Sequence, residues 1–501
     1  MSLVTKGIVR IHRWFGVILC LFFAGWFASG AVLLYVPFPS LSDTERWDYS
    51  QLIDSSRIHI SPAEAIESGK LSTLNRLRII GLGERGVYVL EPNTGPVRAV
   101  WADNGELVQF LKKDLIVNSF SSISNTPVTE IEGPIEFDQW IVHHRFNSYR
   151  PFYKLKLNDP GSEEIYYSQR TGEPMQQTFE DERFWGYLGA VIHWIYPTIL
   201  RKHHDLWSFL VWWLSLAGIA MVLSGLWTGF SSLWNQRRKS NSLLNPYKGW
   251  LKWHQTLGIL GGVVTLTWIF SGWLSMDHGR LFSSPTPSRF NLEKFRGLSL
   301  DQAVSNISSA TLRGLGSFKE AQFFSVDGKV YVLIRTENKS KLLSLGQKYN
   351  LVPSQFSEKE LVSAVKKGWS GFEIKGVYKL DKFDRYTNLR EGSLPPKTLR
   401  VEINDPEKTW VHVDMETGAL VSVMDQSRRA YRWLYNGLHS FDFPGFSNHR
   451  PVWDIVIISF LILGFSLSVT GVVVGWKKLW NSRRIKVHSS NYVSIKATEQ
   501  R

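Results

Sequence analysis

Four long apolar stretches stand out in the pattern of hydrophobic and polar positions along the chain. Crossing a lipid bilayer takes about 20 apolar residues, and each stretch is that long, without Lys, Arg, Asp or Glu in its apolar body. The first stretch follows basic residues, as in a signal peptide, but its 23 residues exceed a signal-peptide core, which favours an uncleaved anchor. The predicted spans are Trp14 to Val36, Leu206 to Phe230, Leu257 to Met276 and Val452 to Trp476.

The basic residues between the spans predict how the chain crosses the membrane. Residues 1–13, 231–252 and 477–501 together hold 15 Lys or Arg and one acidic residue, which leaves 43 basic and 43 acidic residues elsewhere. The whole net charge of +14 therefore lies in three short segments. Short basic segments stay in the cytoplasm, so we expect both termini and the middle loop inside, and residues 38–205 and 277–451 outside. This topology explains the excess of basic residues, so nucleic-acid binding is not needed to explain it. Attraction of the basic segments to anionic lipid is the secondary interpretation.

The chain also contains an internal repeat. The segment that begins at His12 matches the segment that begins at His254, 242 positions later. The segment that begins at Leu155 matches the segment that begins at Val401, 246 positions later. Each half therefore consists of a helix, an outside segment, a short helix and a second helix. Because both halves begin and end inside, they have the same orientation, and we expect a pseudo-two-fold axis along the membrane normal.

The outside segments have the pattern of small α+β units. Ser61–Gly69 begins with Ser, Pro and Glu at the positions of a helix N-cap, first turn and capping box. Short β-branched and aromatic runs follow, separated by turn formers, which predict strands. The second outside segment repeats this order in "SLDQAVSNI" and "AQFFSVDGKVYVLIR", and each segment ends with a strand that enters a Thr-Gly turn.

Six of the 13 histidines form three pairs that correspond under the repeat. A histidine on a membrane helix is costly unless it has a partner, so it is a functional candidate. Two imidazoles that face one axis would approach a plane from opposite sides, as the axial ligands of bis-histidine haem do. The pairs are His12 with His254, His193 with His439, and His203 with His449.

The positions of these pairs predict two sites for haem iron. His12 and His254 begin their helices, so we expect them to ligate a haem near the cytoplasmic surface. His193 and His439 lie in short aromatic helices, and we expect them to ligate a second haem near the outer surface. The alternative is that histidines at helix ends bind lipid phosphate, beside Trp residues that anchor the interface.

His203 and His449 carry two interpretations of equal weight. Each lies among polar residues where a span begins, so each is either an interfacial anchor or a haem ligand that replaces or supplements the outer pair.

A small hydroxyl residue precedes glycine in all four spans. We expect these dipeptides to let helices pack closely, which is their usual role in membranes. They are Ser29-Gly30, Ser224-Gly225, Ser271-Gly272 and Thr470-Gly471.

A basic cluster in the first outside segment has no copy in the second. It comprises His143, His144, Arg145 and Arg150. A solvated loop is the preferred interpretation, and attraction of an anionic chelate is the alternative.

Composition and motifs exclude several other kinds of redox centre. The single cysteine, Cys20, excludes an intrachain disulfide, thiolate-ligated iron–sulfur or zinc centres and a Cys-x-x-Cys-His haem attachment. The chain has no Gly-x-Gly-x-x-Gly after a strand, no Walker loop and no His-Glu-x-x-His. Flavin and nicotinamide are therefore disfavoured, and electrons would come from a quinol or a separate cytoplasmic donor.

The motifs "HRWFG" and "HQTLG", the repeated histidines and the helix-then-strand units resemble the PepSY-associated membrane protein family. The resemblance covers most of the chain. It implies an α+β integral membrane protein of four transmembrane helices in two parallel-oriented repeats, each with a periplasmic PepSY-like domain and a short interfacial helix. The implied boundaries are 1–37 for the first membrane helix with a cytoplasmic N-terminus, 38–181 for the first PepSY-like domain, 182–235 for an interfacial helix and the second membrane helix, 236–249 for a cytoplasmic loop, 250–276 for the third membrane helix, 277–427 for the second PepSY-like domain, 428–480 for an interfacial helix and the fourth membrane helix, and 481–501 for a cytoplasmic tail.

The resemblance also implies a function. Some members of the family are iron-regulated proteins of the bacterial inner membrane that bind haem b and reduce ferric siderophores. We therefore expect a haem-dependent ferric-siderophore reductase with two haems b, in contact with membrane lipid, a ferric siderophore and a quinol or cytoplasmic donor. We expect no nucleic-acid partner. The sequence does not decide whether the protein forms a homodimer. The alternatives are a colourless protein that binds or regulates a periplasmic peptidase, and a siderophore or iron transporter.

Overall fold

The computed structural model describes residues 3–71, 73–240, 245–280, 287–337, 339–380, 384–386 and 394–498. Residues 241–244 of the predicted loop and 499–501 of the predicted tail thus lie outside the described residues. The chain divides into two compact units. We call them the helical unit (Met1–Phe38, Trp185–Phe282 and Tyr431–Arg501) and the sheet unit (Pro39–Phe184 and Ser283–Ala430).

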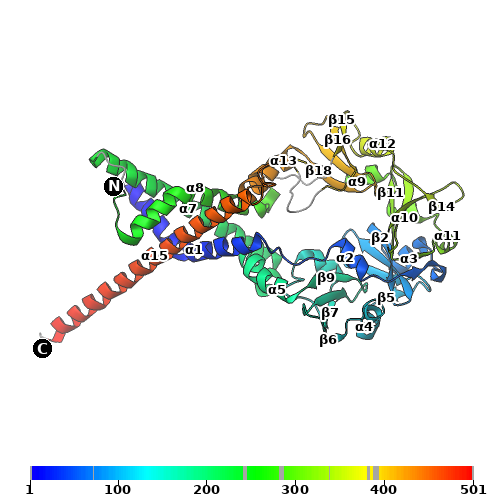
Figure 1. The fold of residues 1–501 in the computed structure, drawn as a ribbon, viewed down its shortest axis with the longest axis horizontal. Helices are drawn as coiled ribbons and strands as arrows, with labels where there is room; N and C mark the ends of the chain where they lie inside the picture. Colours follow the sequence, from blue (N-terminus) through cyan, green and yellow to red (C-terminus); the bar gives the residue numbers. More distant parts are fainter. Residues whose placement is uncertain are drawn as a thin grey trace. The chain divides into compact units, whose positions relative to one another are not determined.

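Four long helices form the helical unit (Figure 1). Helices α1 and α8 each pack against both α7 and α15, so every helix has two neighbours in the bundle. Phe23, Phe27, Trp268 and Trp453 are among the buried side chains at its centre. The helices are α1 (Leu3–Leu33), α7 (His204–Ser240), α8 (Gly249–Ser275) and α15 (Val452–Thr498).

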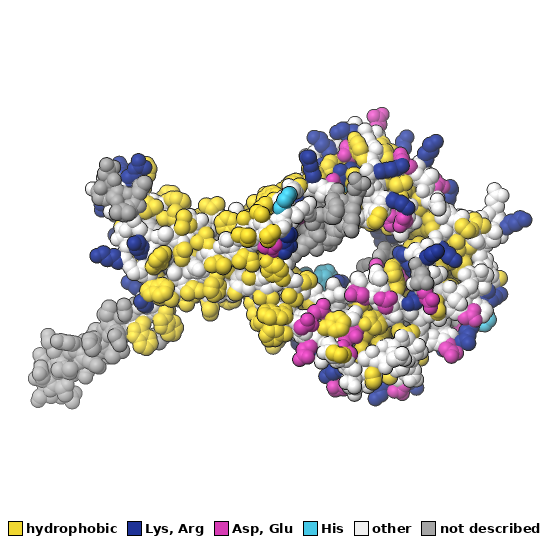
Figure 2. All heavy atoms as spheres, viewed as in Figure 1, with side chains coloured by type: hydrophobic (Ala, Val, Ile, Leu, Met, Phe, Trp, Pro, Cys, Tyr) yellow, Lys and Arg dark blue, Asp and Glu magenta, His cyan; other side chains and the backbone are white. Residues whose placement is uncertain are grey.

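The four predicted spans are confirmed as helices that are long and apolar enough to cross a membrane. The helices extend beyond the apolar stretches, because a helix satisfies its own backbone hydrogen bonds in lipid and in water alike. Helix α1 begins at Leu3 rather than Trp14, so His12 lies within it. Figure 2 shows hydrophobic side chains around the bundle and Lys and Arg at the end where Figure 1 marks the N-terminus.

Short helices precede α7 and α15, and each contains a π-helical turn. A π turn inserts one extra residue and is frequent at functional sites. His193 lies two residues after the end of the first turn, and His439 lies two residues after the end of the second. The segments are α5 (Glu180–Gly186), η3 (Tyr187–Val191) and α6 (Thr198–Arg201) before α7, and α13 (Gln426–Arg432), η5 (Trp433–Gly437) and α14 (Leu438–Ser440) before α15.

Three antiparallel sheets and a two-stranded pair of β1 (Ile53–Asp54) with β10 (Ser317–Phe318) build the sheet unit. The largest sheet has eight strands in the order β14-β13-β12-β11-β2-β3-β4-β5, and the two others have the orders β6-β7-β8-β9 and β15-β16-β17-β18. The first set is β2 (Leu74–Leu82), β3 (Arg85–Pro92), β4 (Arg98–Trp101), β5 (Leu107–Val108), β11 (Glu320–Val326), β12 (Lys329–Arg335), β13 (Ser340–Leu345) and β14 (Leu351–Pro353). The others are β6 (Val128–Ile135), β7 (Phe152–Leu157), β8 (Glu164–Ser168), β9 (Pro174–Thr178), β15 (Ile374–Leu380), β16 (Thr398–Ile403), β17 (Trp410–Asp414) and β18 (Leu420–Met424).

Short helices complete the described elements. Ser61 caps α3 with the expected capping box, and Ser299 does the same for α10. The helices are α2 (Asp43–Asp48), η1 (Ser55–Arg57), α3 (Pro62–Gly69), α4 (Lys113–Ser121), η2 (His144–Tyr149), α9 (Arg289–Arg296), α10 (Leu300–Val304), α11 (Ser309–Arg313) and α12 (Glu358–Gly368) in the sheet unit, and η4 (His278–Arg280) in the helical unit.

Pairing of β2 with β11 joins the two halves of the chain in one sheet. Ala321 pairs with Ile79 and Phe323 with Leu77, and all four side chains are buried in a shared core. These strands were expected in separate segments, 38–181 and 277–427, and their pairing was not predicted. The domain boundaries themselves stay a prediction.

An ionic network also connects the halves beside this pairing. The buried guanidinium of Arg78 donates to Glu173 and to Glu320, with Nη1 2.5 Å and 3.2 Å from their carboxylate oxygens. Arg46 donates to Glu320 at 2.8 Å. Burial opposes ionisation of Glu320, but the positive charges of Arg78 and Arg46 outweigh it and lower its pKa from 4.5 to about 2.

Candidate functional site

Two pairs of histidines meet in the helical unit. The ring centres of His12 and His254 lie 6.2 Å apart, and those of His193 and His439 lie 6.1 Å apart. Each pair takes one histidine from each half of the chain, and all four side chains are half-buried. Helices α1 and α8 carry the first pair, and the short segments before α7 and α15 carry the second.

The first-half histidines are held through Nδ1 by another helix. His12 Nδ1 lies 3.0 Å from the carbonyl oxygen of Met221 and 3.4 Å from Ser224 Oγ in α7. His193 Nδ1 lies 3.1 Å from the carbonyl oxygen of Trp26 and 3.3 Å from Ser29 Oγ in α1. A carbonyl oxygen only accepts hydrogen bonds, so Nδ1–H is the donor in both cases.

The second-half histidines make the corresponding contact. His254 Nδ1 lies 3.2 Å from Thr470 Oγ1 in α15, and His439 Nδ1 lies 3.0 Å from Ser271 Oγ in α8. The hydroxyl of Thr470 donates its hydrogen to the carbonyl oxygen of Leu467, and that of Ser271 to Trp268. Because each hydroxyl has spent its hydrogen, its oxygen accepts from the imidazole Nδ1–H.

These contacts select one tautomer for all four rings. When Nδ1 carries the hydrogen, Nε2 carries the lone pair. Histidines that bind metals commonly donate their other ring N–H to a carbonyl or similar acceptor, which fixes the ring and raises its basicity. The four imidazoles are therefore prepared to bind a metal through Nε2.

Glycine makes room for each imidazole where the hydroxyl residue holds it. A Cβ atom on Gly225 would lie 2.7 Å from Cε1 of His12, and one on Gly30 would lie 3.3 Å from Cε1 of His193. In the second half, a Cβ on Gly471 would lie 2.5 Å from Sγ of Cys20 and 3.2 Å from Cε1 of His254, and one on Gly272 would be in ordinary contact with His439 at 3.5 Å. These hydroxyl–glycine dipeptides were expected to serve helix packing, and their contacts with the histidines were not predicted.

The spacing of each pair fits iron held between two imidazoles. A metal–nitrogen bond of about 2.0 Å on each side, and about 1.1 Å from each nitrogen to its ring centre, separate the ring centres by roughly 6 Å. The observed separations of 6.2 Å and 6.1 Å agree with this value. Neutral imidazole nitrogen is also a suitable ligand for iron. The separation within both pairs thus suits two imidazoles that bind one metal ion from opposite sides.

His203 and His449 are placed differently. Both side chains are exposed, and within the described ranges no ring contact joins them. Nδ1 of His449 contacts the carbonyl oxygen of Gly445 in its own segment. The geometry that unites the other two pairs is not repeated here.

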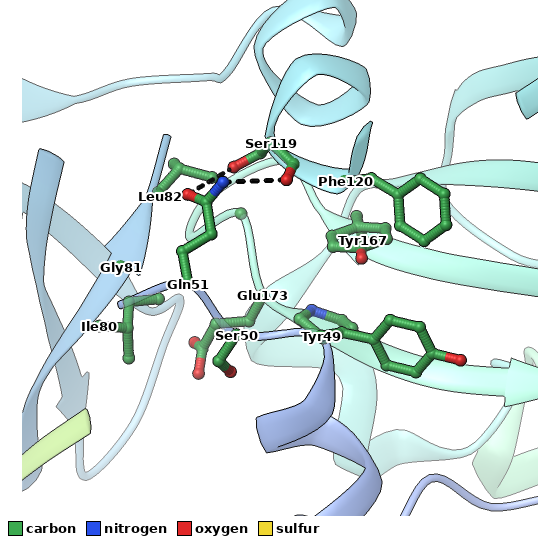
Figure 3. Close-up of a pocket in the computed structure, with 12 residues that line it drawn as sticks. Tyr49, Ser50, Gln51, Ile80, Gly81, Leu82, Ser119, Phe120, Tyr167 and Glu173 are labelled. Atoms are coloured by element: carbon green, nitrogen blue, oxygen red, sulfur yellow. Dashed lines mark hydrogen bonds between the residues drawn. The ribbon is translucent and has the colours of Figure 1, made fainter. Parts of the chain in front are cut away.

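Two polar features of the sheet unit are held by hydrogen bonds within that unit. Arg150, assigned above to a solvated basic loop, is instead buried, and its guanidinium donates to the carbonyl oxygens of Glu136 and Ile141. A small pocket in the same unit is lined by polar groups that bind one another (Figure 3). In it, Gln51 donates to the carbonyl oxygen of Ser119 and accepts from the hydroxyl of that residue.

Comparison with known proteins agrees with the membrane layout. A family model described as PepSY-associated TM region matches residues 9–322, which is more than half of the chain. Among curated proteins, none matches the chain. With this match, and four helices suited to cross a membrane, the chain belongs to the PepSY-associated TM region family.

Proposed function

We propose that this protein is a bacterial inner-membrane haem b protein that passes electrons across the membrane to a ferric siderophore. The proposal rests on one observation: two pairs of imidazoles lie in the helical unit, with ring centres 6.2 Å apart in one pair and 6.1 Å apart in the other. The siderophore as acceptor, and a quinol or cytoplasmic donor, come from the family resemblance and the absence of nucleotide-binding motifs in the sequence.

The protein's own residues would place and tune two haems. His12 and His254 would supply both axial nitrogens of one, and His193 and His439 those of the other. Bound haem would supply one-electron oxidation and reduction. Backbone carbonyls and hydroxyls that accept from Nδ1–H would leave the Nε2 lone pair of each ring for the iron.

The two sites would lie toward opposite faces of the membrane. His12 and Ser29, which contacts His193, are both in α1 and are separated by 17 residues. At about 1.5 Å per residue, this corresponds to about 25 Å along the helix, close to the 30 Å of a bilayer core. The inner pair would lie at the basic, cytoplasmic end, with both outside segments in the periplasm.

The repeat supports a pseudo-two-fold arrangement of the halves. Each histidine pair takes one member from each half, and each hydroxyl–glycine dipeptide receives a histidine of its own half. Two parallel-oriented repeats about an axis along the membrane normal would produce this pattern.

The absorption spectrum of the detergent-purified protein, oxidised and dithionite-reduced, tests the proposal. After haem-replete expression we expect a Soret band and about two haems per chain by pyridine haemochrome. His12→Ala and His193→Ala should each lose about one haem, because each removes one axial ligand. A colourless wild-type protein would contradict the proposal and favour a peptidase-binding role for the outside segments.

A second measurement separates haem binding from siderophore reduction. Dithionite-reduced protein is mixed anaerobically with a ferric siderophore, and reoxidation of haem is followed in its visible bands. Stoichiometric reoxidation supports the reductase, whereas a reduced spectrum that does not change would leave a haem protein with another acceptor.

A further inference from the structure

We infer that the hydroxyl–glycine dipeptide in each membrane helix is a positioning device for one haem-ligating imidazole: the hydroxyl oxygen lies within reach of Nδ1–H, and the glycine leaves space for the ring. This inference rests on the proposed function. It assigns a role to residues outside the axial ligands. The dipeptides are Ser29-Gly30, Ser224-Gly225, Ser271-Gly272 and Thr470-Gly471.

The four dipeptides follow the two offsets of the internal repeat. Ser29 and Ser271 differ by 242 positions, as His12 and His254 do. Ser224 and Thr470 differ by 246 positions. The same arrangement of hydroxyl, glycine and imidazole thus occurs at four places, twice near each end of the bundle.

The hydroxyl oxygen acts as an acceptor in each case. Ser29, Ser224, Ser271 and Thr470 all donate to the carbonyl oxygen three residues earlier in their own helix, at 2.7–3.2 Å. That bond directs the oxygen lone pairs toward Nδ1–H of the neighbouring histidine. A more electron-rich imidazole stabilises oxidised iron, so we expect the hydroxyl to lower the reduction potential of the bound haem.

The glycines differ from those that serve helix packing alone. A Cβ on Gly261 would meet the side chain of Leu463 at 2.9 Å, and one on Gly464 would meet Phe27 at 2.4 Å, so these two glycines leave space for a side chain of a neighbouring helix. At Gly225 and Gly30 the nearest heavy atom is instead an imidazole carbon, at 2.7 Å and 3.3 Å. A methyl group at these two positions would push the ring out of its place in the pair.

The hydroxyl is tested at Ser271, because its Oγ is the contact of His439 Nδ1. Ser275 is a matched control one turn later in α8, since it makes the same kind of bond to a carbonyl three residues earlier. In Ser271→Ala we expect about tenfold weaker binding of haem at the outer site and a more positive midpoint potential for it. Ser275→Ala should match the wild type, and Ser271→Thr should restore both properties.

The glycine is tested at Gly225, with Gly229 as the control one turn later. A Cβ on Gly229 would lie 3.4 Å from Ile259, an ordinary contact, whereas one on Gly225 would lie 2.7 Å from His12. We expect Gly225→Ala to lose about one of two haems and Gly229→Ala to lose none. If Gly225→Ala is poorly folded by circular dichroism, Gly30→Ala is compared with Gly25→Ala, where the space is open.

These results separate the inference from the proposed function. A wild-type protein without haem overturns both. A wild type with two haems, together with Ser271→Ala and Gly225→Ala that match their controls in haem content and midpoint potential, overturns the inference alone. Midpoint potential and rescue by threonine distinguish positioning from a merely structural contribution, which would change stability and leave both unaffected.

Discussion

Arg78 and Glu320 come from opposite halves of the chain, and their side chains meet in the sheet unit with Nη1 and Oε2 3.2 Å apart. Both are buried, and Glu173 and Arg46 complete the network. Removing one member of a buried ion pair leaves the other charge uncompensated. The network therefore makes the junction of β2 and β11 dependent on charge as well as on apolar packing.

We accordingly expect Glu320→Gln to lower the free energy of unfolding by roughly 3 kcal/mol. Thermal unfolding of the full chain in detergent, followed by tryptophan fluorescence, measures this as a lower melting temperature. Glu358→Gln is the control, because Glu358 pairs with Lys379 on the surface, where ion pairs contribute about 1 kcal/mol or less. Equal melting temperatures for the two variants would contradict a stabilising role for the network.

The stability of the sheet unit should depend on pH through His412. Its Nε2 accepts from Arg400 Nε at 2.8 Å, and burial together with the charge of Arg400 lowers its pKa from 6.5 to about 4. The unfolded chain therefore binds this proton first, so stability is complete above about pH 6.5 and declines as the pH falls toward 4, by up to about 3 kcal/mol.

Melting temperatures of wild type and His412→Gln between pH 7.5 and pH 4.5, roughly spanning that interval, check this expectation. The variant should lose most of the decline, whereas a His59→Gln control, at an exposed position, should keep it. Parallel curves for wild type and His412→Gln would refute the assignment.

The exposed histidines provide a third prediction, about ligand identity. Among the described residues, neither His203 nor His449 contacts a hydroxyl–glycine dipeptide of a membrane helix, so we expect His203→Ala and His449→Ala to retain both haems. Pyridine haemochrome content and the reduced visible spectrum measure the outcome. If either variant lost one haem while His193→Ala kept both, His203 and His449 would be the ligands of the outer haem instead.

A fourth prediction concerns the direction in which the helices cross the membrane. With Cys20 replaced by alanine, Gln109→Cys and Gln355→Cys each place a thiol at an exposed position of the sheet unit, and Asn235→Cys places one near the basic end of α7. A membrane-impermeant maleimide should label the first two from the periplasm. Asn235→Cys should react only after the inner membrane is permeabilised, and the reverse pattern would invert the topology.

The spans and the histidine pairs could be predicted from sequence because their signals are local or repeated. Length and apolar composition define a membrane helix without knowledge of its neighbours. Matching offsets link His12 to His254 and His193 to His439 in the sequence alone.

Two other features depend on contacts that the sequence does not specify. The role of Ser271 at His439 follows from how α8 packs against a short helix, with the two residues 168 positions apart in the sequence. The offset of 242 between Ser29 and Ser271 is nevertheless the offset between His12 and His254, and this was the signal that could have indicated more than packing. Likewise, Arg150 looks like a surface cation in the sequence, and only the fold of its loop reveals the carbonyl groups that it binds.

The pairing of β2 with β11 has a consequence for how the protein is made. Residues 83–319 separate the two strands, so a ribosome has to translate most of the polypeptide before β2 can acquire its second neighbour. Until then the nascent first half ends its sheet in an open edge, which is a template for pairing with stray strands. The sheet can therefore be completed only after residues 320–326 have been made.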